Sequence, residues 1–130
     1  MTGAPELPEW FANAQQALID GDVAGWMAMF APDAVHEFPW VPEGRVTRLE
    51  GWDAINDYMQ QLNDRGRLRF GSFETIGVHE TPDSLVVEMI GHHFRGDAPV
   101  DLGYVSVMTL RDGKVTHFRD YMNPLQLSTR

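Results

Sequence analysis

The chain contains no cysteine among its 130 residues, which excludes disulfide bonds, thiolate zinc sites and cysteine nucleophiles. It has one lysine, Lys114, and its arginines are scattered, so no basic cluster is available for nucleic acid or an anionic membrane. The net charge of −9 argues against the same two partners. No apolar run has the length of a membrane span, and the N-terminus lacks the pattern of a signal peptide. We therefore expect a cytoplasmic protein.

The length and composition are those of one globular domain. Hydrophobic residues make up 43% of the chain and charged residues 22%, which is typical of folded soluble domains and not of disordered segments. A chain of this length supports one sizeable core and is too short for two. We find no repeat, low-complexity tract or linker. The sequence therefore predicts a single domain over residues 1–130, with its core at about 8–126.

Apolar residues at helical spacing predict three helices in the first half of the chain. The first begins at Pro8 and ends at Gly21. Asp22 is placed to cap the second, which extends over residues 23–30. After a short strand at residues 34–38 and an irregular loop, the third helix covers residues 52–62.

The second half of the chain has the pattern of strands. They are expected at residues 68–80, 85–94, 100–110 and 115–122. Asp112-Gly113 between the last two favours a type I′ turn and therefore a hairpin. Helices followed by an antiparallel meander of about four strands indicate an α+β fold, with the sheet curled around the third helix.

Asp120 is the first candidate for chemistry. Its alternate neighbours on the last predicted strand are Phe118 and Met122, so one face of that strand presents a carboxylate between two large apolar side chains. Such surroundings raise the pKa of a carboxyl group and make it usable as a general acid or base near neutral pH. The alternative is that Asp120 faces solvent or pairs with an arginine.

Asp101 is the second carboxylate candidate. It shares its side of the preceding strand with Gly103, Val105 and Val107, and two carboxylates in one pocket would separate their pKa values into acid and base roles. The alternative is a solvated loop end.

His36 shares a strand face with Phe38 and has an ordinary pKa near neutrality, so it is a further candidate acid, base or hydrogen-bond donor. The alternative is a strand histidine bonded to a backbone carbonyl. The adjacent residues His92 and His93 point to opposite faces of a strand and cannot easily share one ion, and no other metal-ligand spacing occurs. Because no phosphate loop or dinucleotide fingerprint is present either, we expect neither a metal nor a cofactor.

Several other residues are candidates for contact with a ligand. Tyr58 is expected toward the pocket edge of the third helix, with a core position as the alternative. Trp40 lies in a proline-rich loop that could roof a pocket. Met89 and His93 have the alternation expected of a cavity face, as do Phe118 and Met122.

Four segments carry a resemblance to a known family: residues 30–39, 49–55, 104–115 and 118–124. They resemble the end of the second helix, the entry to the third helix and the closing hairpin of ketosteroid-isomerase-like proteins. The most similar groups are the SnoaL-like polyketide cyclases and the phenazine-biosynthesis A/B proteins, within the nuclear-transport-factor-2-like fold. The resemblance implies a cone in which a curved sheet and three helices enclose one deep apolar pocket, and homodimers formed through the outer face of the sheet.

The resemblance also bears on the site. Related cyclases and epoxide hydrolases have an aspartate in a similar Arg-Asp-Tyr context, which implies an acid/base role for Asp120. Phe38 stands where ketosteroid isomerase has its catalytic aspartate, which argues against steroid isomerisation. Met89 and Gly91 stand where limonene-type epoxide hydrolases need an arginine and a second aspartate, so simple epoxide hydrolysis ranks lower.

The leading hypothesis is a cofactor-free enzyme that transfers protons in an apolar, oxygenated, polyketide-like metabolite as a cyclase, isomerase or dehydratase. Asp120 would move the proton, with Asp101 or His36 completing the acid/base pair and Tyr58 orienting an oxygen. The alternative is a non-catalytic small-molecule binding or accessory protein of the same fold. Epoxide opening is a third, lower possibility.

Overall fold

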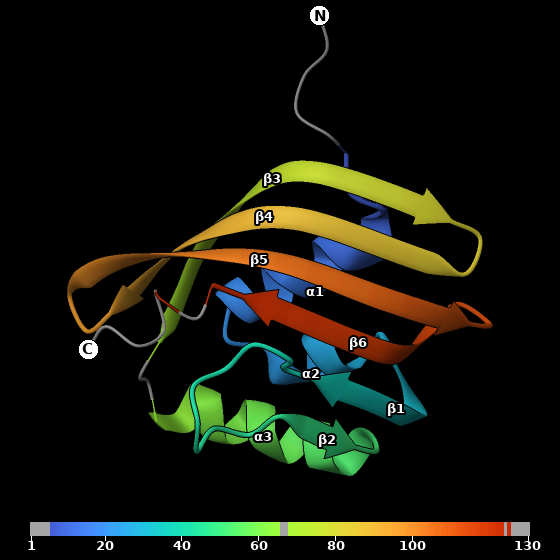
Figure 1. Ribbon diagram of the computed structural model, residues 1–130, viewed down its shortest axis with the longest axis horizontal. Helices are drawn as coiled ribbons and strands as arrows, with labels where there is room; N and C mark the ends of the chain where they lie inside the picture. The colour runs from blue at the N-terminus through green and yellow to red at the C-terminus, as the bar shows by residue number, and fades with distance from the viewer. Residues whose placement is uncertain (1–5, 66–67, 124, 126–130) are drawn as a thin grey trace, which may run out of the picture.

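The computed structural model describes residues 6–65, 68–123 and 125, which form three helices and one six-stranded sheet (Figure 1). The helices are α1 (Glu9–Ile19), α2 (Val23–Met27) and α3 (Trp52–Arg65). The strands are β1 (Phe30–Glu37), β2 (Arg48–Glu50), β3 (Arg69–Thr81), β4 (Ser84–Arg95), β5 (Ala98–Arg111) and β6 (Lys114–Met122). The expected α+β class and the helix-first element order are confirmed.

The strands follow the order β2-β1-β6-β5-β4-β3 across the sheet. Neighbouring strands are antiparallel except β1 and β6, which are parallel. The long strands β3, β4 and β5 curve across the front of the molecule in Figure 1, with α1 behind them and α2 below, near β6. Because α1 contacts β3 at one end of the sheet and α3 contacts β1 and β2 at the other, the sheet curves around all three helices and not around α3 alone.

The starts of α1 and α2 follow the sequence signals. Pro8 occupies the N-cap position of α1. The side chain of Asp22 accepts a hydrogen bond from the backbone N–H of Gly25 at 3.0 Å and so caps α2, as expected for an N-cap aspartate. Gly21 follows α1 with a φ of 75°, a left-handed conformation that a glycine adopts without strain.

Two boundaries differ from the sequence-based expectation. The second helix ends at Met27, and Phe30, which was expected in the helix, begins β1. The reason lies far along the chain: Phe30 pairs with Val115 of β6, and the backbone N–H of Val115 donates to the Met29 carbonyl at 2.8 Å. The second difference is β2, which helical and strand periodicity did not indicate because it contains only three residues.

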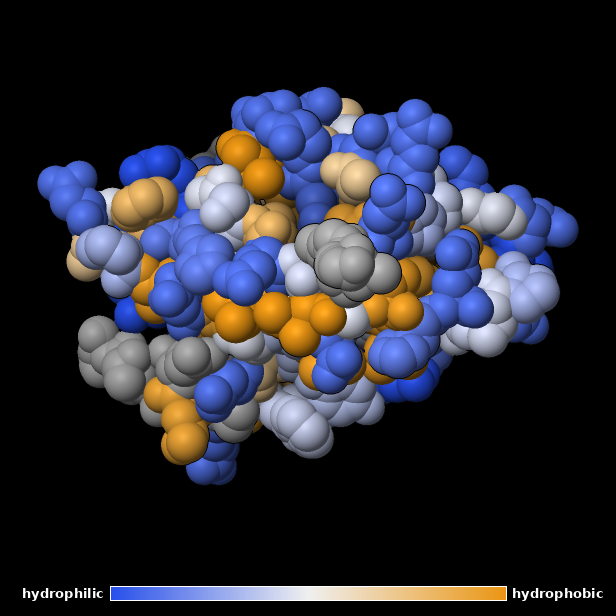
Figure 2. Space-filling view, turned by 90° about the horizontal axis from the view of Figure 1, so that it is seen from above, coloured by the Kyte–Doolittle hydropathy of each residue, from blue (hydrophilic) through white to orange (hydrophobic). Residues whose placement is uncertain are grey.

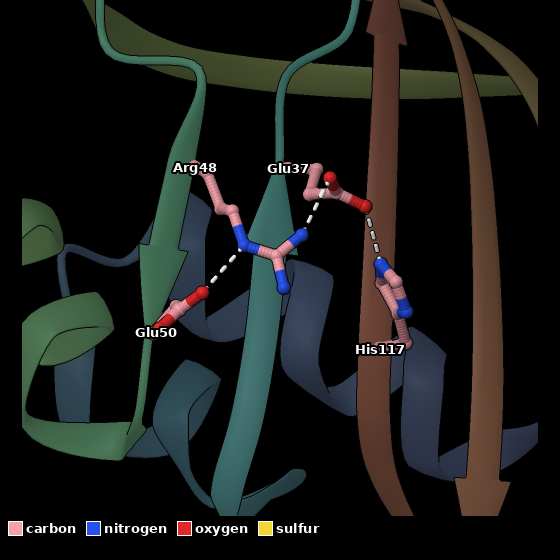
Figure 3. A network of polar contacts seen from close by, with 4 residues as sticks. All are labelled: Glu37, Arg48, Glu50 and His117. Carbon is pink, nitrogen blue, oxygen red and sulfur yellow. Dashed lines mark hydrogen bonds and ion pairs between the residues drawn. The ribbon is translucent and has the colours of Figure 1, made fainter.

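A polar network on the sheet holds β2 to β1 and β1 to β6 (Figure 3). Arg48 of β2 donates to Glu37 of β1 at 2.8 Å and to Glu50 of its own strand at 2.7 Å. On the other side of β1, Nε2 of His117 lies 2.5 Å from the second carboxylate oxygen of Glu37. The His117 hydrogen bond, followed by that of Arg48, lowers the pKa of Glu37, although the desolvation of the carboxylate acts in the opposite direction.

The β5–β6 hairpin closes as the sequence predicts. Asp112 and Gly113 have φ values of 53° and 78°, the two positive values that a type I′ turn requires. Beyond the turn the pairing shifts: Leu110 faces Val115, but the next pair is Thr109 with His117. Thr116 is therefore an extra residue in β6, a β-bulge that changes which residues of β5 face those of β6.

The core lies between the inner face of the sheet and the helices. Phe11, Met27, Ile55, Leu85 and Met108 are among its fully buried members. Seen from above, apolar residues form a band across the middle of the molecule with hydrophilic residues around it (Figure 2). No helix in the described part of the chain is long and apolar enough to cross a membrane.

Candidate functional site

A cavity of about 1020 Å³ opens on the concave side of the sheet. Its apolar wall combines side chains of all three helices, of the inner face of the sheet and of the residue after β1. They include Phe11, Leu18, Trp26, Phe38, Met59, Leu62, Phe73, Met89, Leu102, Phe118 and Met122. The polar side chains that line it are Gln15, His36, Arg45, Tyr58, Gln61, Arg95, Tyr104, Ser106 and Asp120. This is a large apolar chamber with a few polar groups, the usual composition of a small-molecule site.

Asp120 enters the cavity from β6, between Phe118 and Met122 on the same face of the strand. Its Oδ1 atom is buried and has no hydrogen-bond partner among the described residues. Burial penalises the charged form and raises the pKa of Asp120 to about 7. A carboxyl group with this pKa is present in both protonation states near neutral pH, as a general acid or base requires.

His36 enters the cavity from β1, the strand next to β6. Its ring packs among aromatic side chains in tilted arrangements, with centroids 4.4 Å from Phe38 and 4.7 Å from Phe118. Within the described structure neither ring nitrogen has a hydrogen-bond partner, and burial lowers the pKa of His36 to about 3. The imidazole is therefore neutral at physiological pH, with one nitrogen to donate and one to accept a hydrogen bond from a ligand.

Tyr58 reaches the cavity from α3, and its ring lies 5.5 Å from that of Phe38. Burial is the main reason that the pKa of Tyr58 is raised, with a smaller opposite effect of Arg45 and a further increase from Asp120. The phenol therefore stays protonated and can donate a hydrogen bond.

The structure brings together most of the side chains that the sequence singled out. Asp120, His36, Tyr58, Phe38, Met89, Phe118 and Met122 all line the cavity. They come from β1, β4, β6 and α3, so the chamber is assembled from segments far apart in the chain.

Asp101 is not among them, and its expected place in the pocket is wrong. Its side chain is 60% exposed on the outer face of β5, where it lies 2.9 Å from His92. The residues of β5 that face the cavity are Leu102, Tyr104 and Ser106, the opposite alternation to the one expected. Both faces of β5 carry apolar residues, so alternation of hydrophobicity did not reveal which face is inside.

Trp40 and His93 also lie elsewhere than expected. Trp40 is 58% exposed and its ring packs at 4.8 Å against Tyr121, although residues 41, 42 and 44–46 of the same loop do line the cavity. His93 points inward from β4 but is buried behind Tyr104 and does not line the cavity wall. His92, on the opposite face, contacts Glu74 and Asp101.

Sequence reasoning missed several polar residues of the cavity. The assignment of Asp101 to the pocket placed Tyr104 and Ser106 on the wrong face of β5, and Gln15, which is buried against Met89, was not considered. The signal that identifies Ser106 is its pairing with Asp120 across the hairpin. That pairing depends on the bulge at Thr116.

The arrangement suits proton transfer on a ligand held in an apolar chamber. Asp120 supplies a carboxyl group that is free to exchange a proton, and neutral His36, Tyr58 and Ser106 supply hydrogen-bonding groups around it. The large apolar wall favours a ligand with a hydrocarbon body and a small number of oxygen atoms.

Comparison with known proteins gives consistent results. Residues 10–118 match the SnoaL-like domain. The uncharacterised PhzA/B-like protein PA3332 of Pseudomonas aeruginosa is 34% identical in a 125-residue alignment that covers 91% of this chain and 84% of that protein.

Two solved structures have the same fold. A proposed isomerase from Bacillus subtilis is 31% identical, with a TM-score of 0.79 over 91% of this chain and 86% of that one. An epoxide hydrolase of Mycobacterium tuberculosis, described as LEH-like, is 20% identical, with a TM-score of 0.72 over 90% and 82% of the two chains. The second similarity is one of fold alone.

Proposed function

Because the chain belongs to the SnoaL-like family, whose fold hosts unrelated activities, we propose a function from the site itself: an enzyme that transfers a proton in an apolar, oxygenated small molecule. The reaction is an isomerisation, a cyclisation or a dehydration. The observation that carries the proposal is the carboxyl group of Asp120 in the wall of an apolar cavity, whose buried Oδ1 atom has no hydrogen-bond partner among the described residues.

A buried carboxylate without a partner destabilises a folded protein. The presence of one in the cavity wall therefore favours a functional role for Asp120. Asp120 has none of the partners that a structural aspartate has: no arginine, lysine or backbone N–H in the described structure satisfies its Oδ1 atom. A pKa of about 7 lets the same group take a proton from one carbon or oxygen atom and return it to another.

His36 complements this role without competing for it. Because the pKa of His36 is about 3, the imidazole does not supply a proton as a cation at neutral pH. It acts as a neutral hydrogen-bonding group that orients an oxygen atom of the substrate beside Asp120. Asp101 has no part in the proposal, since its side chain is on the outer face of the sheet.

The test requires only proton transfer and not the natural substrate. 1-Tetralone and 2-tetralone, apolar ketones of a size that the cavity admits, are incubated with the protein in D2O. The loss of the α-proton signal is followed by NMR. We expect the wild type to accelerate exchange and Asp120→Asn to abolish the acceleration. Asp101→Asn makes the same chemical change on the outer face and is the matched control. It should accelerate the exchange of the ketones as much as the wild type does.

Two results contradict the proposal. Equal acceleration by wild type and Asp120→Asn would remove Asp120 from the chemistry. Binding of the ketones without any acceleration of exchange would favour the alternative, a protein that binds small molecules and does not transform them.

A further inference from the structure

A buried chain of hydrogen bonds ends at a second residue of the cavity wall, Tyr104. The chain begins at the backbone N–H of Gly71, which lies 3.1 Å from Nδ1 of His93. Nε2 of the same imidazole lies 3.1 Å from the hydroxyl oxygen of Tyr104. Tyr104 lines the cavity, whereas His93 lies behind it with 1% of its surface exposed.

The direction of each hydrogen bond follows from the donor at its start. A backbone N–H can only donate, so Nδ1 of His93 must accept and carries no proton. A neutral imidazole then has its one proton on Nε2, and that N–H donates to the Tyr104 oxygen. The tyrosine hydroxyl is an acceptor in this bond, which leaves its own proton free to point elsewhere.

The neutral state of His93 is supported by its surroundings. The rings of Phe70 and Phe73 approach it edge-on at 5.1 and 5.0 Å, and burial, the largest cause, lowers the pKa of His93 to about 4. A protonated imidazole would also place an N–H against the N–H of Gly71. Burial likewise raises the pKa of Tyr104, so its hydroxyl keeps its proton.

Two glycines make this arrangement possible. A Cβ on Gly71 would lie 2.2 Å from the carbonyl oxygen of His92, so only a glycine brings its N–H to the His93 ring at this bulge. A Cβ on Gly91 would lie 2.1 Å from Nε2 of His93 and 2.8 Å from the Tyr104 ring. The chain therefore has the smallest residue both where the N–H donor must approach the β4 backbone and where a side chain would displace the imidazole.

Tyr104 is also well placed relative to Asp120. Ser106 is the direct partner of Asp120 across β5 and β6, and Tyr104 lies two residues further along the same face of β5. The two residues are thus diagonal neighbours on the cavity wall, with backbone positions about 7–8 Å apart. The buried Oδ1 of Asp120 makes no hydrogen bond to Tyr104.

We propose that Tyr104 donates a hydrogen bond to an oxygen atom of the substrate, and that His93 is the positioning residue that aims this hydroxyl. The inference rests on the proposed function and specifies its substrate as a carbonyl compound. Asp120 takes the proton of a carbon next to the carbonyl group, the C–H bond breaks, and its electron pair moves onto the carbonyl oxygen. Tyr104 stabilises the negative charge on that oxygen, and Asp120 returns the proton to the substrate.

The experiment measures binding and not turnover, so that it stands apart from the test of Asp120. Dissociation constants are measured for 1-tetralone and for tetralin, the same ring system without oxygen. We expect the wild type to prefer the ketone, and Tyr104→Phe to weaken ketone binding by about fivefold to tenfold without changing that of tetralin. Circular dichroism verifies that the variant is folded.

A spectroscopic measurement distinguishes a role of His93 in orienting the Tyr104 hydroxyl from a merely structural role. The carbonyl stretch of bound 13C-labelled 1-tetralone should shift to lower frequency in the wild type and return toward its value in an apolar solvent in Tyr104→Phe. His93→Phe should give a smaller shift and a broader band, because the hydroxyl remains but is no longer held. His93→Gln, whose amide N–H can replace Nε2–H, should restore part of the shift.

No ketone preference in the wild type, or a preference and frequency shift retained in Tyr104→Phe, would overturn the inference. Unchanged spectra in His93→Phe would overturn the role of His93. Asp120→Asn could keep the ketone preference and also accelerate proton exchange as much as the wild type. That result would reject Asp120 as the base and leave the donor role of Tyr104 intact.

Discussion

Ser106 and Asp120 face each other directly across β5 and β6, and both side chains enter the cavity. A hydroxyl group beside a carboxylate would ordinarily be its nearest hydrogen-bond donor. Here the buried Oδ1 of Asp120 still has no partner among the described residues. The carboxyl group is thus held at the cavity wall by the register of the sheet and not by polar contacts, which leaves it available to a ligand.

Asp120 gives the stability of the protein a pH dependence whose sign follows from its raised pKa. The folded protein binds the proton with a pKa of about 7, against an ordinary value of 3.8. The free energy of unfolding therefore falls as the pH rises from about 4 to about 7, by up to about 4 kcal/mol. In Asp120→Asn this loss is absent, so the variant gains stability relative to wild type between pH 5 and pH 8.

Urea denaturation at the two pH values measures this gain. Asp101→Asn, on the outer face, provides the comparison and should not show it. A stability difference between Asp120→Asn and wild type that is the same at pH 5 and pH 8 would show that the carboxyl group titrates normally.

His36 acts in the opposite direction. The unfolded chain takes up a proton at this histidine below pH 6.5, whereas the folded protein does so only near pH 3. Stability is therefore lost as the pH falls through this range, by about 2–3 kcal/mol at pH 4.5. We expect His36→Phe to be more stable than wild type at pH 4.5 and similar at pH 8, as measured by urea denaturation.

The exposed histidine His79 offers a matched control, since His79→Gln removes an imidazole from the surface. Should His36→Phe lose stability in acid as steeply as the wild type, the burial of a neutral imidazole would not be the cause of the acid sensitivity.

The network in Figure 3 predicts a small, salt-dependent contribution to stability. Glu37→Gln removes the charge that faces both Arg48 and His117. Because these side chains are 26–46% exposed and the ion pairs are therefore screened by solvent, we expect a decrease in melting temperature of only about 1–3 °C at pH 7 and low salt. The pKa of Glu37 is lowered in the folded protein, so this contribution is present above its unfolded pKa and disappears as the pH falls through the folded value. Thermal unfolding at low and high salt provides the measurement, and a decrease that salt leaves unchanged would contradict the electrostatic explanation.

Gly91 is the position where a single methyl group should disturb the site most. Gly91→Ala places a Cβ against His93 and Tyr104, and the resulting overpacking costs about 1–3 kcal/mol. Gly77→Ala on the neighbouring strand is the control, because its Cβ would meet the far ends of the exposed Glu88 and His79 side chains, which can move aside. Urea denaturation should show destabilisation in Gly91→Ala alone. Equal stability of the two variants would mean that the His93 ring moves aside freely.

The sequence was sufficient to predict the fold class and most of the elements, because their signals are local. Asp22 caps α2 and Asp112-Gly113 closes the last hairpin for reasons contained in a few residues. The start of β1 at Phe30 could not be predicted in this way, since it depends on pairing with Val115 at the other end of the chain.

Besides the apolar residues on both faces of β5, the error on Asp101 has a second physical cause, the bulge at Thr116. If β5 and β6 paired regularly from their turn, Val105 would face Asp120, and Asp101 would share the cavity face with it. The extra residue moves the register by one, so Ser106 faces Asp120 instead and Tyr104 comes to the inside. Because of the extra residue Thr116, Tyr104 lies in the cavity and Asp101 lies outside it. The residue types of β6 do not predict this bulge.

The parallel pairing of β1 with β6 has a consequence for how the protein is made. β1 can pair early with β2, but its other neighbour, β6, is the last strand to be synthesised, so β1, β2 and α3 join the β3–β5 part of the sheet only at the end. Such distant pairing slows folding and prolongs the time for which apolar surface is exposed. Asp120 lies on that last strand. The cavity wall and its carboxyl group are therefore complete only when β6, the last strand, pairs with β1 and β5.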